Sequence, residues 1–196
     1  MKSYLKLFLA VFILFATACQ DKSSTEPEEI VTLKVVIAKD INANVTGKTY
    51  YRFSDSTTVT GADTATNKWD IAFNKTTIYT NSGTSGPGQG GALVLKNTDF
   101  VNLKEASADG YKTDAQNAPA IATGSGNGWY LYDAVNNIIN PAAGVVIVFK
   151  TGQGKYAKVQ IISYYKGAPT TPSASSESRY YTFKYFYQPD GSRKLE

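Results

Sequence analysis

Short runs of alternating residues, separated by turn-forming residues, constrain this 196-residue chain more than any other feature. In residues 179–188, every second position from Tyr181 to Tyr187 is aromatic, and this period of two is typical of a strand with one buried face. No segment of ten or more residues keeps a convincing helical period. The sequence therefore predicts an all-β fold of mostly antiparallel sheets with little helix, built from roughly eight to ten strands at ordinary strand and loop lengths.

The residue patterns of several segments predict whether each strand is buried on one face or on both. Residues 145–149 are all apolar, which is typical of a strand covered on both faces, and the glycine-containing turn after them predicts a hairpin with residues 156–165. Residues 69–74 alternate, which predicts a half-buried strand with Asp70 pointing outward. The other predicted strands are 31–39, 49–53, 76–80, 92–96 and 129–132.

Three polar stretches, at residues 54–66, 81–91 and 167–178, separate these strands and are predicted to be loops. The second holds five glycines. A phosphate-binding loop does not fit there, because no Gly-Lys-Ser/Thr sequence and no following helix are present. The glycines instead predict a mobile or tightly turning surface loop.

The N-terminus has the order of a secretory leader over residues 1–18. Lys2 and Lys6 precede an apolar stretch, and small residues end it. The apolar stretch is too short to span a membrane comfortably.

Cys19 is the only cysteine and directly follows the small residues of this leader. The arrangement resembles the lipobox of bacterial lipoproteins, with Ala16 where leucine is usual. The resemblance implies that Cys19 is a lipid anchor; the alternative is an ordinary secreted protein with an unpaired thiol. Residues 19–29 are polar and predict a flexible tether, and residues 30–196 are predicted to form a single β domain.

Composition excludes several classes of function. The chain has no histidine, one cysteine and one methionine, Met1, so Ser-His and Cys-His catalysis, most metal sites, and His or Met ligation of haem iron are excluded. The 20 basic and 16 acidic residues are scattered, and no nucleic-acid partner is expected. We predict that the protein is not an enzyme. A glycosidase-like pair of carboxylates is the enzymatic alternative, because such partners meet only in the fold.

The chain is rich in tyrosine, with 14 such residues. A tyrosine is apolar in its ring and polar at its tip, which suits a surface that stacks a planar or sugar-like ligand. Cross-strand aromatic packing is the alternative interpretation. The adjacent pairs 164–165 and 180–181 are expected to present one ring to each face of a sheet.

An ordered set of short sequences over about residues 30–190 resembles the HmuY-like lipoproteins of the Bacteroidota, whose best-known member captures haem. The resemblance implies an all-β fold and an outer-membrane lipoprotein exposed at the cell surface. It also implies non-catalytic binding of haem or another tetrapyrrole, for delivery to an outer-membrane transporter. The sequences are KWDIAF at 68–73, IYTNSG at 78–83, GQGGA at 88–92, WYLYD at 129–133, INP at 139–141, GKYAKVQIISYY at 154–165 and RYYTFKY at 179–185.

The chain also departs from this family. The founding member holds haem iron between two histidines and some relatives use methionines, but residues 20–196 contain neither. A tyrosine phenolate is the ligand that remains, as in some other haem proteins, although an unperturbed tyrosine has a pKa near 10. The candidate ligand-binding residues are Tyr111, Trp129, Tyr130 and Tyr132. The alternative is a relative that binds a non-haem ligand, such as a glycan or peptide, on the same scaffold.

Overall fold

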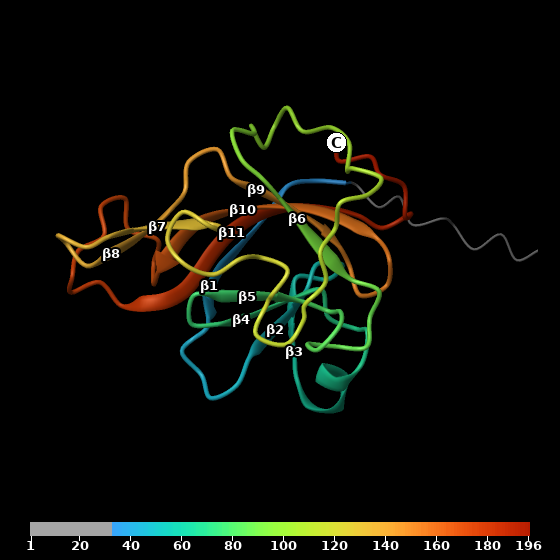
Figure 1. Ribbon diagram of the computed structural model, residues 1–196, viewed down its shortest axis with the longest axis horizontal. Coiled ribbons are helices and arrows are strands. Elements are labelled where there is room, and N and C mark those ends of the chain that lie inside the picture. Colours follow the sequence, from blue (N-terminus) through green and yellow to red (C-terminus); the bar gives the residue numbers. More distant parts are fainter. Residues whose placement is uncertain (1–32) are drawn as a thin grey trace, which may run out of the picture. The chain divides into compact units, whose positions relative to one another are not determined.

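The computed structural model describes residues 33–196, so the predicted leader, Cys19 and the predicted tether lie outside the described residues. Strands dominate this range, with a single short 3-10 helix, η1 (Gly61–Ala65) (Figure 1). None of the helical structure in residues 33–196 has the length and hydrophobicity needed to cross a bilayer. The strands are β1 (Val36–Asn42), β2 (Thr49–Arg52), β3 (Thr57–Val59), β4 (Ile71–Asn74), β5 (Thr77–Thr80), β6 (Gly91–Leu95), β7 (Tyr130–Asp133), β8 (Ile138–Pro141), β9 (Val146–Lys150), β10 (Tyr156–Tyr165) and β11 (Ser178–Gln188).

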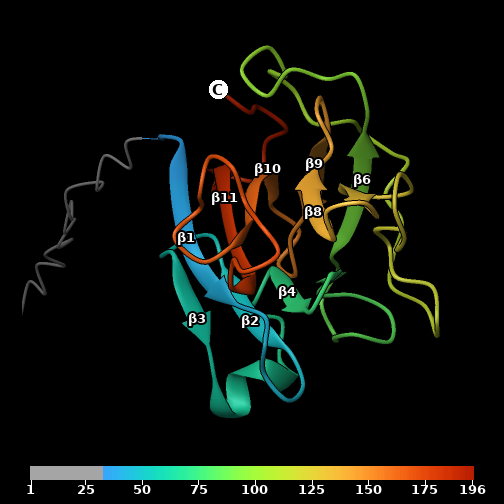
Figure 2. The same cartoon turned by 90° about the vertical axis from the view of Figure 1, so that its left-hand side faces the viewer.

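The described strands form a five-stranded sheet in the order β1-β11-β10-β9-β6, a four-stranded sheet in the order β3-β2-β4-β5, and the separate hairpin β7–β8. Figure 2 shows the five-stranded sheet with β2, β3 and β4 below it. All strand pairs are antiparallel, which confirms the predicted fold class. The predicted β9–β10 hairpin is also confirmed. Strands β3 and β8 were not predicted from the sequence, because each is short and lies next to turn-forming residues.

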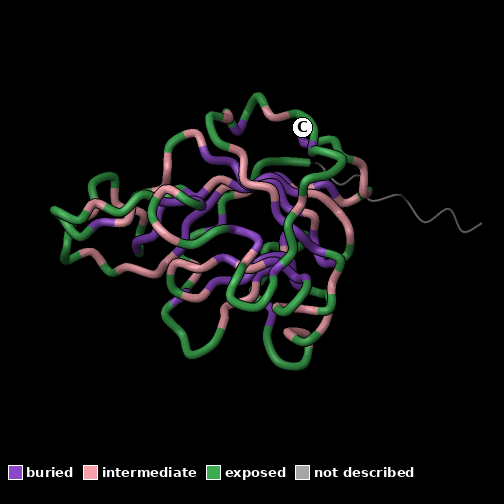
Figure 3. Tube along the Cα trace, in the orientation of Figure 1, coloured by how far each residue is buried: buried purple, intermediate pink, exposed green. Residues whose placement is uncertain are grey.

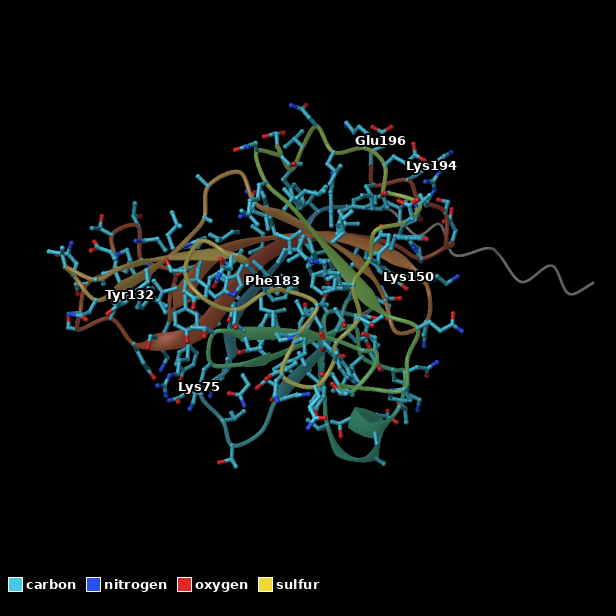
Figure 4. The ribbon with its side chains drawn as sticks, in the orientation of Figure 1. Lys75, Tyr132, Lys150, Phe183, Lys194 and Glu196 are labelled. Atoms are coloured by element: carbon cyan, nitrogen blue, oxygen red, sulfur yellow. The ribbon has the colours of Figure 1, made fainter. Side chains whose placement is uncertain are left out.

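The main core lies between the two larger sheets. Alternate side chains of β11 (Tyr181, Phe183 and Tyr185) pack with side chains of β2, β4 and β9, and the buried parts of the chain gather there (Figure 3). Phe183 lies at the centre of this aromatic layer, 5.4 Å from the ring of Tyr51 and 5.6 Å from that of Phe73 (Figure 4). Much of the tyrosine content is therefore explained by packing between sheets.

The outer face of the five-stranded sheet is covered as well. Phe100, Ala106 and the C-terminal Leu195 pack on Val148 and Phe186. Lys158 is buried beneath this cover, where its ammonium donates hydrogen bonds to the carbonyl oxygens of Phe100 (2.8 Å) and Leu103 (2.7 Å). Burial on both faces explains why residues 146–149 of β9 are all apolar, as predicted.

The expectation that Asp70 points outward is wrong. Asp70 is 5% exposed, and its carboxylate accepts a hydrogen bond of 2.8 Å from the N–H of Phe53. Burial raises the pKa of this carboxyl to about 6. The strand predicted over 69–74 is present as β4, but it is not half-buried, since Ala72 on its second face is also buried, in a small cluster with Val59 and Trp69. Trp69 contributes this second cover: it packs in the cluster with Ala72, whereas period-two alternation places it on the face of Ile71 and Phe73, which lie in the main core.

The expectation that Tyr164 and Tyr165 face opposite sides of the sheet is also wrong. Both side chains are buried in the main core, with their ring centroids 5.8 Å apart. Register irregularities between Ile161 and Tyr165 interrupt the regular alternation of β10 against β11. An irregularity of this kind re-aims side chains along a strand, which explains the shared burial.

The glycine-rich stretch 81–91 turns tightly around the buried side chain of Asn81. The Asn81 amide donates hydrogen bonds of 2.9 Å to the carbonyl oxygens of Thr66 and Trp69, and its Oδ1 accepts one of 2.9 Å from the N–H of Gly88. A Cβ added at Gly90 would lie 2.6 Å from the Asn81 carbonyl oxygen, and one at Gly86 would lie 2.2 Å from its Oδ1. These glycines are needed for close approach to Asn81.

Candidate ligand-binding site

A cleft of about 700 Å³ lies between the β7–β8 hairpin and the loop that joins β10 to β11. Its hairpin side is formed by residues around Asn136 and Asn137, which make the turn, and its loop side by the segment 170–174. The volume lies within the range of about 300–1,000 Å³ that is typical of small-molecule sites. The lining residues are Asp133, Val135, Asn136, Asn137, Ile138, Asn140, Thr170, Thr171, Pro172, Ser173 and Ala174.

Buried aromatic residues fix the base of the hairpin to the main core. The ring of Trp129 lies 5.6 Å from that of Tyr164 and 5.2 Å from that of Tyr181, and its indole N–H donates a 2.9 Å hydrogen bond to the carbonyl oxygen of Thr76. The hydroxyl of Tyr165 accepts a 2.8 Å hydrogen bond from the N–H of Ile139 on β8. The hairpin wall of the cleft therefore has a rigid attachment.

The free end of the hairpin exposes large apolar side chains. Val135, in the turn, is 89% exposed, and Leu131 and Tyr132 on β7 are also exposed. Figure 4 shows Tyr132 on this projecting hairpin. Exposed apolar groups beside a cleft are typical of a surface that binds a ligand or partner.

The carboxylate of Asp133 forms hydrogen bonds within the turn that joins β7 to β8. It accepts hydrogen bonds from the backbone N–H groups of Val135 (2.9 Å) and Asn136 (3.2 Å), and from the Asn136 side-chain amide (2.7 Å). These hydrogen bonds lower the pKa of the Asp133 carboxyl below its usual value. The remaining lining offers amide and hydroxyl groups together with the apolar surfaces of Val135, Pro172 and Ala174.

The predicted site residues near the hairpin take different positions. Trp129 is 2% exposed and Tyr130 is buried beside it, with their ring centroids 4.9 Å apart, so both belong to the core. Tyr132 is 46% exposed, and its hydroxyl donates a 2.8 Å hydrogen bond to Oδ1 of Asn137, a residue of the cleft. Of these three residues, Tyr132 has the position best suited to meet a ligand.

Tyr111 lies apart from the other three predicted site residues, Trp129, Tyr130 and Tyr132. It packs against Tyr156, at a centroid distance of 6.0 Å, in the cluster on the outer face of the five-stranded sheet. Its hydroxyl donates a 3.1 Å hydrogen bond to the carbonyl oxygen of Ser107. Burial raises the pKa of Tyr111 to about 12, which opposes phenolate formation at neutral pH.

The cleft does not fit axial ligation of haem iron. Its lining contains no histidine, methionine, cysteine or tyrosine. Within residues 33–196, no group of three or more His, Cys, Asp or Glu side chains could hold a metal ion. Any ligand of this cleft must be held through hydrogen bonds and apolar contacts.

Sequence reasoning missed most of the cleft. A hairpin signal was present after the predicted strand at 129–132, because the Asn136-Asn137 pair is followed by two isoleucines. In the structure, Asn137 adopts the left-handed conformation of such turns, with φ of 57°. The segment 170–174 was predicted only as part of a loop. Its position opposite the hairpin depends on tertiary packing and has no local sequence signal.

Comparison with known proteins gives one family. A model of the HmuY protein family matches residues 44–185. A search of curated proteins finds no match.

Solved structures share the fold at low sequence identity. The apo HmuY analog of Tannerella forsythia is 17% identical, with a TM-score of 0.52 over 81% of this chain and 96% of that one. Apo PinO of Porphyromonas gingivitis is 16% identical, with a TM-score of 0.53 over 80% and 99%. A candidate lipoprotein of Bacteroides fragilis is 17% identical, with a TM-score of 0.50 over 79% and 92%. Likeness at this identity establishes the fold.

Proposed function

Because this chain belongs to the HmuY family, we propose that it is a non-catalytic binding protein whose ligand is haem or another tetrapyrrole. The ligand occupies the cleft between the β7–β8 hairpin and the β10–β11 loop. One observation carries this proposal. In a chain of this family, a cleft of about 700 Å³ lies beside a hairpin that exposes large apolar side chains.

The lining suggests how such a ligand would be held. Val135, Pro172 and Ala174 offer apolar surface to the macrocycle, and hydroxyl and amide groups such as those of Thr171 and Asn140 can donate hydrogen bonds to its carboxylates. The lining offers no axial ligand, so this mode of binding recognises the macrocycle and its substituents, and the iron contributes little.

The proposal includes a cellular location, the outer membrane. Cys19 would carry lipid that holds the protein at the outer membrane, with the domain at the cell surface. An outer-membrane transporter would receive the ligand there. The family match and the order of the leader support this part of the proposal.

A cleft-blocking variant tests the site. The full chain in detergent is titrated with ferric haem and followed by absorbance, and Ala174→Trp, which places a large ring in the cleft, is expected to weaken binding about tenfold or more. Ala108→Trp adds the same ring at an exposed position outside the cleft and should leave binding unchanged. If both variants weakened haem binding equally, or if neither variant weakened it, the ligand would bind outside this cleft.

One observation favours a second candidate function. The cleft is lined mainly by hydroxyl and amide groups, and these suit a glycan or a peptide as well as a tetrapyrrole. In that case ferric haem would give no saturable spectral change with the unmodified chain.

A further inference from the structure

A second cavity, of about 460 Å³, lies outside the hairpin cleft and shares no lining residue with it. Five separate parts of the chain line it. Lys48 precedes β2, Thr77 and Tyr79 belong to β5, and the segments 84–85 and 114–119 together with Thr123 form the rest of the wall. The volume suits a ligand about the size of one sugar ring with its substituents.

Lys48 gives this cavity a half-buried positive charge. Its ammonium lies 4.1 Å from the ring centroid of Tyr79 and donates a 3.2 Å hydrogen bond to Oγ of Ser85. Burial lowers the pKa of Lys48, although Asp114 acts against this shift. No salt bridge within residues 33–196 includes Lys48. A half-buried cation that makes no ion pair favours an anion beside it.

Asp114 also lines the cavity and its carboxylate attracts the Lys48 ammonium through space, but the two side chains form no ion pair, and backbone N–H groups bind both carboxylate oxygens. Its Oδ2 accepts a 3.0 Å hydrogen bond from the N–H of Thr80, and its Oδ1 accepts one of 2.7 Å from the N–H of Ala120. Ala115 and Ala118 exchange two further backbone hydrogen bonds, of 3.0 and 3.1 Å. These bonds fix the wall formed by 114–119, so the cavity is preorganised.

The rest of the lining is rich in groups that recognise hydroxyls. Thr84, Gln116, Asn117 and Thr123 line the cavity, and all four residues are exposed. Hydroxyl and amide side chains both donate and accept hydrogen bonds, as the hydroxyl groups of a sugar do. The combination of one cation with several such groups matches a ligand with one negative charge and several hydroxyl groups.

We propose that this cavity binds a carboxylate-bearing sugar, with the carboxylate at Lys48 and the hydroxyl groups at the amide and hydroxyl side chains of the wall. The site is independent of the proposed tetrapyrrole cleft and adds a second ligand to this protein.

Calorimetric titration of the full chain in detergent tests the proposal, with glucuronate as the probe and with glucose and acetate as comparisons. Glucuronate should bind at least tenfold more tightly than either comparison, because only glucuronate has both the charge and the hydroxyl groups. Lys48→Met should weaken glucuronate binding about tenfold or more, while Lys39→Met, at an exposed lysine of β1 outside the cavity, should leave it unchanged.

Gln116→Ala is a second variant that tests the site if Lys48→Met disturbs folding. Gln116 is exposed, so its substitution should leave the fold intact and still weaken glucuronate binding about threefold or more. Ala174→Trp should leave glucuronate binding unchanged, which separates this site from the hairpin cleft. Acetate binding as tightly as glucuronate would overturn the sugar assignment. Absence of glucuronate binding, or unchanged binding in Lys48→Met, would overturn the site itself.

Discussion

Trp129→Ala is expected to lower the free energy of unfolding by about 3–5 kcal/mol, the usual range for removing a buried large aromatic side chain. The indole is 2% exposed and packs against Tyr130, Tyr164 and Tyr181. Its N–H donates to the carbonyl oxygen of Thr76, which would lose this partner. The substitution therefore removes both packing and a hydrogen bond where the hairpin joins the core.

Urea unfolding of the full chain, followed by far-UV circular dichroism, measures this effect. Leu131→Ala is the control, because Leu131 lies two residues further along the chain but is exposed, and it should change stability by about 0.5 kcal/mol or less. If Trp129→Ala left stability unchanged while abolishing ligand binding, Trp129 would be a ligand-contacting residue and its assignment to the core would be wrong.

Asn81→Ala is expected to destabilise the fold by about 3 kcal/mol or more, because it leaves several buried backbone groups without partners at about 1–3 kcal/mol each. The groups concerned are the carbonyl oxygens of Thr66 and Trp69 and the N–H of Gly88. The Asn81 side chain joins the end of η1 and the start of β4 to the glycine-rich turn. Its loss should loosen all three.

The same unfolding measurement applies, with Asn102→Ala as the control. Asn102 is exposed, and its backbone N–H makes the local hydrogen bond to Asp99, so the substitution should cost about 0.5 kcal/mol or less. A comparable, small effect from both substitutions would show that Asn81 does not organise the turn.

Sequence periodicity was sufficient for the fold class and for most strands. The alternation of aromatic residues in β11 and the apolar run of β9 each reflect a burial pattern that one strand carries by itself. Asp70 and Tyr165 were placed wrongly because their burial depends on a neighbouring segment or on a local irregularity in β10. Such features arise from tertiary packing and leave little trace in a short window of sequence.

The candidate site was less predictable than the fold. Trp129, Tyr130 and Tyr132 were predicted as ligand-binding residues, yet Trp129 and Tyr130 lie in the core and Tyr132 reaches the cleft only through Asn137. Most residues that line the cleft are asparagine, threonine, serine and proline residues of the β7–β8 hairpin and of the β10–β11 loop. Residues of these types are common in loops, so nothing in the sequence distinguishes those that line a cavity. The role of Tyr111, Trp129, Tyr130 and Tyr132 in ligand binding remains a prediction.

The most direct test of the proposed function compares ferric haem with metal-free protoporphyrin in parallel titrations of the full chain, followed by absorbance and by quenching of tryptophan fluorescence. Because the cleft lining offers no axial ligand, the two ligands should bind saturably with dissociation constants within about threefold of each other. Saturable binding of ferric haem alone, with the charge-transfer bands of a tyrosinate complex, would contradict binding through the macrocycle. Absence of saturable binding by either ligand would contradict the tetrapyrrole proposal as a whole.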